Sequence, residues 1–71
     1  MDRFTLTQIA DRPGWWSVTD TQSGARIDFE AGNFNDSQEV VLPPDTEPEP
    51  LKLARLMREF GEFMEKHREL V

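Results

Sequence analysis

The stretch WWSVTDTQSGARIDFE, residues 15–30, decides the fold. Apolar and polar residues alternate on both sides of the turn-forming segment 21–24, which is typical of a β-hairpin. A four-residue loop at 21–24 defines the cross-strand pairs, which are Trp16–Phe29, Val18–Ile27 and Asp20–Ala25. The large apolar side chains of these pairs share one face of the hairpin. A shift of one residue would mix the two faces, so the pattern specifies the register.

Trp15 and Trp16, the two tryptophans of the chain, must point to opposite faces of such a strand. Pairing with Phe29 assigns Trp16 to the core. Trp15 lies on the other face, whose further members are Ser17, Thr19, Arg26, Asp28 and Glu30. An indole on a polar face suggests a surface that a partner covers. The alternatives are that the 31–37 loop, the proline-rich connector or Arg12 covers it.

The remaining segments complete an α+β fold in a single domain, 1–71. Alternation predicts strands at about 3–9, 15–20, 25–30 and 38–42. Four prolines within 43–50 predict a stiff, extended, acidic connector, and a helical period follows over about 50–70. We therefore expect an antiparallel three- to four-stranded β-meander followed by one long C-terminal α-helix packed on one sheet face.

The predicted helix carries a wide apolar stripe. Its centre, which we expect to cover the sheet, comprises Leu53, Met57, Phe60 and Met64. One flank comprises Leu56, Phe63 and Leu70. The sheet could curl around the helix and cover this flank, or the flank could join a partner helix in a twofold homodimer. Gly61 costs about 1 kcal/mol relative to Ala in a helix interior, unless close packing needs the missing side chain.

Composition narrows the classes of partner. The chain has 71 residues, no cysteine and a net charge of −6. Residues 1–50 hold ten acids and three arginines, whereas residues 51–71 hold four acids and five basic residues. The absence of a basic patch disfavours direct binding to nucleic acid, and an acidic surface favours basic partners. The N-terminus lacks the apolar stretch of a signal peptide, and Val40–Leu42 is too short to span a membrane, so we expect a soluble cytoplasmic protein.

The sequence gives little evidence for a catalytic or metal-binding site. His67 is the only histidine and falls in the last turns of the predicted helix, where the helix dipole favours it and where it can reach the terminal carbonyls. The series Asn33, Asn35, Ser37 and Glu39 resembles the start of a calcium loop but lacks its central glycine and closing glutamate. Asp28 and Glu30 share a strand face that we expect to be solvated beside Arg26. We therefore expect no catalytic, cofactor or metal site and no enzymatic activity.

The indole on the polar sheet face, the acidic charge and the wide helix stripe together favour a small, homodimeric, non-enzymatic protein–protein interaction module. We expect it to act as an adaptor or regulator of a basic partner. Its expected partner-binding residues are Trp15, Phe34, Asp28, Glu30, Asp36 and Glu39, and its expected dimer residues are those of the helix flank, Leu56, Phe63 and Leu70. As with Trp15, the alternative is that the chain itself covers the side chain of Phe34. The alternative is an acidic inhibitor of the type that phages and mobile elements encode, whose carboxylates mimic the phosphates of a nucleic acid.

Overall fold

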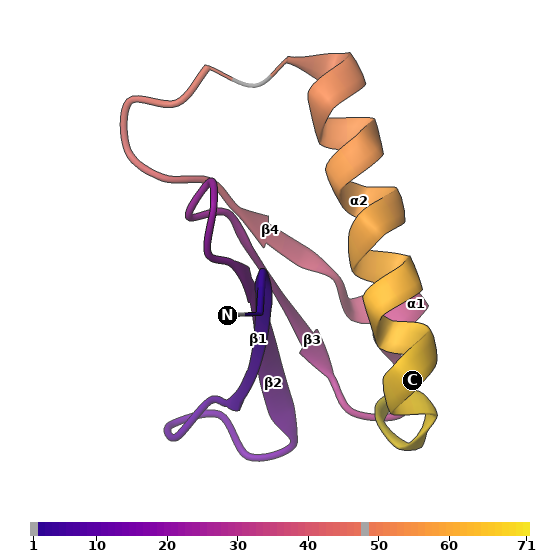
Figure 1. The fold of residues 1–71 in the computed structure, drawn as a ribbon. Helices are drawn as coiled ribbons and strands as arrows, with labels where there is room; N and C mark the ends of the chain where they lie inside the picture. Colours follow the sequence, from indigo (N-terminus) through magenta and orange to yellow (C-terminus); the bar gives the residue numbers. More distant parts are fainter. Residues whose placement is uncertain (1, 48) are drawn as a thin grey trace.

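A computed structural model describes residues 2–47 and 49–71 of the chain. Figure 1 shows a sheet of four strands and a long C-terminal helix that lies along one side of it. The elements in chain order are β1 (Phe4–Gln8), β2 (Trp15–Asp20), β3 (Arg26–Glu30), α1 (Phe34–Ser37), β4 (Glu39–Val41), α2 (Pro50–Met64) and the 3₁₀ helix η1 (Glu65–Leu70). The predicted α+β class is confirmed, with the strand order β1-β2-β3-β4 and all neighbours antiparallel.

The register of the central hairpin is the one that the sequence predicts. Trp16 pairs with Phe29 and Val18 pairs with Ile27, and the backbone N–H of Asp20 donates to the carbonyl oxygen of Ala25 at 2.8 Å. The edge strands continue the same faces, because Leu6 pairs with Val18 on one side and Val40 pairs with Ile27 on the other. We call the face that carries these residues the inner face and the opposite one the outer face.

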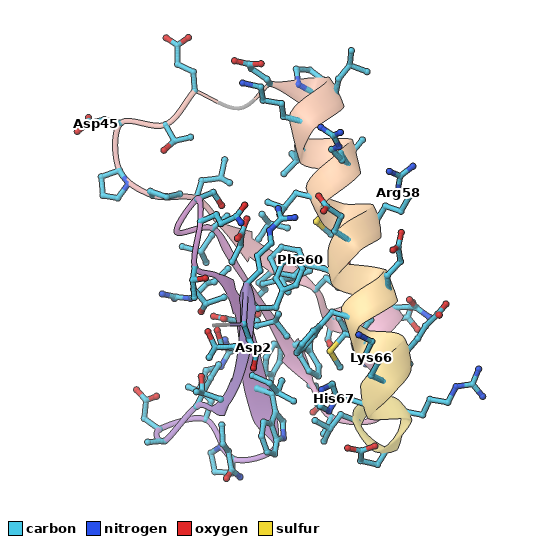
Figure 2. All side chains as sticks on the ribbon, viewed as in Figure 1. Asp2, Asp45, Arg58, Phe60, Lys66 and His67 are labelled. Carbon is cyan, nitrogen blue, oxygen red and sulfur yellow. The ribbon has the colours of Figure 1, made fainter. Side chains whose placement is uncertain are left out.

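The core lies between the inner face and α2. Its buried members are Val18, Ile27, Phe29, Phe34, Phe60 and Met64. Figure 2 shows Phe60 pointing from α2 towards the sheet, while Arg58 points away from it. Phe4 on β1 lies 5.3 Å from Phe60 between ring centroids, within the range of a favourable aromatic pair. Apolar burial on one sheet face and one helix stripe therefore joins the two layers.

Two segments differ from the sequence prediction. The 31–37 loop contains a helical turn, α1, because the hydroxyl of Ser37 donates to the carbonyl oxygen of Asn33 and accepts from the N–H of Glu30. The predicted 50–70 helix changes to 3₁₀ geometry after Met64, and His67 has non-helical angles of φ −129° and ψ 52°. This change lets the carbonyl of Leu70 accept from the N–H of Gly32 at 2.9 Å.

The connector is not extended throughout, so that part of the prediction is wrong. The chain turns at Pro44–Asp45, where Asp45 has a positive φ of 64° and the N–H of Thr46 donates to the carbonyl of Pro43. The connector arches away from the sheet before it enters α2 (Figure 1), and Asp45 lies at the outer side of this arch (Figure 2). Pro48 lies outside the described residues.

No helix in the described ranges has the length and apolar character needed to cross a membrane.

Shortening a buried apolar side chain should destabilise the protein more than shortening an exposed one. Ile27→Val removes one methyl group from a fully buried side chain, so we expect it to lower the free energy of unfolding by about 1 kcal/mol. Leu51→Ala removes more atoms, but Leu51 is 87% exposed, so we expect a change of less than about 0.5 kcal/mol. Urea denaturation measures both values, and a larger loss for Leu51→Ala than for Ile27→Val would contradict this core.

Candidate functional site

The outer face of the sheet is the surface that the sequence singles out. Cross-strand pairing places Trp15 opposite Glu30, Ser17 opposite Asp28 and Thr19 opposite Arg26. On β4, Glu39 pairs with Asp28 and belongs to the same face. No helix of the described chain lies over this face (Figure 1). The predicted separation of polar and apolar residues between the two faces is therefore present.

Arg12 covers Trp15. Its guanidinium carbon lies 3.6 Å from the centroid of the indole ring, which is close cation–π stacking. Its Nη2 atom also donates to Oε2 of Glu39 at 3.1 Å, so the side chain reaches from the β1–β2 turn to β4. The turn is held by the N–H of Trp15, which donates to the carbonyl of Arg12, and by Gly14, whose positive φ of 81° permits the tight bend. Arg12, one of the three candidate covers for this indole, is therefore in place over it.

Arginines also pair two of the acids on this face. The hydrogen bond to Glu39 raises the pKa of Arg12, which keeps the guanidinium charged. Asp28, which we expect to be solvated, is instead buried: it is 6% exposed and accepts from Nε of Arg26 at 3.2 Å, whereas Glu30 is exposed. Glu30 and Asp36 are exposed and belong to no ion pair among residues 2–47 and 49–71. Among the described residues, the unpaired carboxylate of the outer face is therefore that of Glu30 at the end of β3, while Asp36 lies on α1.

Phe34 does not lie on the outer face, although we expect it among the partner-binding residues. It is 5% exposed and packs edge-on against Phe29, with ring centroids 5.0 Å apart. The turn of α1 directs this side chain into the core. A single aromatic residue in a polar stretch shows no periodicity. The sequence therefore does not indicate whether the side chain points into the core or towards the surface.

The expected dimer flank of the helix also packs against the molecule itself. Leu56, Phe63 and Leu70 are half-buried and contact the core cluster, and Phe63 lies 5.5 Å from Phe4 between ring centroids. This arrangement corresponds to the alternative in which the sheet curls around the helix. Among the residues that the structure describes, the exposed large apolar side chains are instead Val40, Val41, Leu51 and Val71.

A cluster that the sequence did not reveal joins the N-terminus, the hairpin and α2. Nε and Nη2 of Arg3 donate to the two carboxylate oxygens of Asp20, each at 3.2 Å, and the same guanidinium donates to Glu59 on α2. Asp20 is 1% exposed and also accepts from the N–H of Gln22 at 3.0 Å and the hydroxyl of Ser23 at 2.9 Å. The cluster borders an open pocket of about 380 Å³ between the connector and α2.

The electrostatics of this cluster favour the ionised forms. Burial opposes ionisation of Asp20, but the hydrogen bonds from Arg3, Gln22 and Ser23 outweigh it and hold the pKa below its ordinary value of 3.8. The same carboxylate, with that of Glu59, raises the pKa of Arg3. An aspartate held in this way has every acceptor engaged, so its role in this arrangement is to hold Arg3 and, through it, α2.

The other sequence candidates have local roles. Nδ1 of His67 lies 3.8 Å from the carboxylate of Glu69, and its ring lies 4.9 Å from that of Phe63. In the polar series at 33–39, Ser37 and the carbonyl of Asn33 form the local hydrogen bonds of α1, and Glu39 pairs with Arg12. Within residues 2–47 and 49–71, no three or more His, Cys, Asp or Glu side chains gather in a way that could hold a metal ion.

Comparison with protein-family models, with curated proteins and with solved structures finds no match to this chain.

The Asp20 cluster predicts an acid-dependent loss of stability. Because folding lowers the pKa of Asp20, its contribution is fully present above pH 3.8 and is lost as the pH falls through the lower pKa of the folded state. We expect Asp20→Asn to lower the free energy of unfolding at pH 7 by about 2 kcal/mol. Below about pH 4 we expect this difference from the wild type to shrink. Urea denaturation across this range measures it, with the exposed Glu30→Gln as control, and an unchanged difference would contradict the assignment.

The Arg12–Trp15 stack predicts the accessibility of the indole. In a Trp16→Phe background, Trp15 is the only tryptophan, so acrylamide quenching reports on it alone. We expect Arg12→Ala to increase the quenching constant, because the guanidinium covers one face of the ring. Arg26→Ala, an arginine of the same face that pairs with Asp28, is the matched control. Equal quenching in the two variants would show that Arg12 does not cover Trp15.

Proposed function

We propose that this chain is a small acidic non-enzymatic protein–protein interaction module that binds a basic partner through the outer face of its sheet. The observation that carries the proposal is Trp15, half-buried on the open sheet face and held there by Arg12. Tryptophan is enriched among the residues that dominate binding energy at protein interfaces. An adaptor or regulatory role in the cytoplasm belongs to the same proposal.

The geometry of Arg12 supports binding at low entropic cost. The guanidinium stacks on one face of the indole and is itself anchored by Glu39, so the ring is held before any partner arrives. Ordering a side chain at an interface costs about 0.5–1.5 kcal/mol, and a side chain that is already ordered avoids part of this cost. Trp15 thus has the properties of a preorganised anchor.

The charges around Trp15 support a basic partner. Glu30 lies directly across from Trp15 in the sheet and is exposed. The chain as a whole carries −6. Complementary charge accelerates encounter with a cationic partner and orients it. A basic segment with one apolar side chain for the indole is the chemistry that fits this surface.

The pairing of acids with arginines favours this module over the nucleic-acid mimic. Mimicry of phosphates needs a row of free carboxylates along one surface. On the outer face, Asp28 is paired with Arg26 and Glu39 with Arg12, so two of its carboxylates are already neutralised. Binding that depends on an indole should also weaken less with added salt than binding by charge mimicry.

The test compares three immobilised proteins in an extract of the source cells: the wild type, Trp15→Ala and Leu51→Ala. We expect a basic protein that the wild type and Leu51→Ala retain and that Trp15→Ala loses. For that protein, calorimetry should show at least about a 30-fold weaker Kd with Trp15→Ala, the size expected of a dominant interface residue. Circular dichroism checks that all three variants are folded.

Two results would contradict the proposal. Retention of the same partner by Trp15→Ala would show that the outer face is not the binding surface. A fall in affinity of several orders of magnitude between 50 and 200 mM salt would instead support the mimic, because extensive charge mimicry depends steeply on ionic strength.

A further inference from the structure

We propose that a second copy of this chain docks in the groove between α1 and the C-terminal half of α2, forming a twofold dimer in which the two α2 helices cross at Gly61. The groove is open and has a volume of about 670 Å³. Phe34 and Met64, which are 5% and 1% exposed, lie at its base, and Val71 lies beside them. Arg58, Glu65 and Arg68 are among the charged residues that line it. Val71 is 40% exposed, so apolar surface reaches the rim.

Gly61 lies in this groove, and the chain's own packing does not explain it. A Cβ atom added at Gly61 would meet no atom within 4 Å. Glycine in a helix interior costs about 1 kcal/mol relative to alanine, so close packing inside the molecule does not account for its presence. A neighbouring helix of a second copy could approach the backbone closely at this point, as small residues permit at helix crossings.

Charge complementarity identifies the occupant as a second copy. Arg58 precedes Gly61 by about one turn and Glu65 follows it by about one turn. In an antiparallel crossing centred on Gly61, Arg58 of each copy therefore lies opposite Glu65 of the other. A twofold axis repeats each contact, so this surface is complementary to itself.

The groove has no net charge that would favour a partner of one sign. Its lining contains two arginines, Arg58 and Arg68, and two glutamates, Glu62 and Glu65. Arg58 makes only an exposed contact with Glu62 at 3.6 Å, and neither Glu65 nor Arg68 forms an ion pair within the described chain. These groups are therefore available to a second copy.

The distribution of charge along the chain also favours this face for self-association. Residues 1–50 contain ten acids and three arginines, so two copies that met through the sheet or connector would repel each other. Residues 51–71 contain five basic residues and four acids. The helix is thus the part of the chain where two copies can meet without strong repulsion.

This interface differs from the flank that the sequence suggests. Leu56, Phe63 and Leu70 pack against the core cluster, whereas the groove lies beside Phe34. It also leaves the outer face of the sheet free in both copies, so a dimer would present two Trp15 surfaces. If the chain proves to be monomeric, the proposal that Trp15 binds a partner is unaffected. If Trp15 proves not to bind a partner, the proposed dimer is likewise unaffected.

Sedimentation equilibrium over a range of protein concentrations tests the dimer. We expect the wild type to approach twice the mass of one chain, and Gly61→Arg to remain monomeric, because a long side chain would occupy the crossing point. Leu51→Arg places the same side chain on α2 outside the groove and should dimerise like the wild type. Circular dichroism should show that both variants are folded, since Gly61 has open space around it.

A charge exchange tests the register without relying on a steric block. Glu65→Arg would place arginines of the two copies opposite each other, so we expect the dimer Kd to rise by about tenfold or more. Adding Arg58→Glu to this variant restores opposite charges, and we expect the Kd to return to within about threefold of the wild-type value. A monomeric wild type at millimolar concentration, or a dimer insensitive to Gly61→Arg and Glu65→Arg, would overturn the proposal.

Discussion

Strands β2 and β3 pair with Trp16 opposite Phe29 and Val18 opposite Ile27, and the rest of the molecule is arranged around this register. Side chains alternate along a strand, so the register that buries Val18 and Ile27 also directs Trp15 to the outer face. It also sends Asp20 to the helix side of the sheet, where its buried carboxylate needs Arg3. A shift of one residue would reverse all of these directions at once.

Two surfaces with different charge follow from this arrangement. The outer face carries Asp28, Glu30 and Glu39, and Arg12 holds an indole among them. The connector carries three further acids. The groove beside α2 is apolar at its base and balanced in charge along its lining. The first surface suits a basic partner and the second suits a copy of the same chain. One small two-layer domain therefore has separate places for two kinds of contact.

The sequence predicts the parts of this structure that depend on periodicity. The register, the four strands and the helical stripe all follow from spacings of two or of three and four residues. The direction of Phe34 does not, because α1 is a single turn whose position depends on hydrogen bonds from Ser37. The cluster of Arg3, Asp20 and Glu59 spans 56 residues of sequence and depends on how α2 crosses the sheet. Arg12 could be named as one cover for Trp15, but only its contact with Glu39 across the sheet explains why it lies there.

The most direct test of the central claim is a set of nuclear Overhauser effects between side-chain protons in solution. The register predicts contacts from the methyl groups of Val18 and Ile27 to the ring of Phe60. It also predicts contacts from the side chain of Arg12 to the indole of Trp15. Contacts between the Trp15 indole and the rings or methyl groups of the core, with Trp16 beside Arg12, would show that the sheet has the opposite register and would contradict this account.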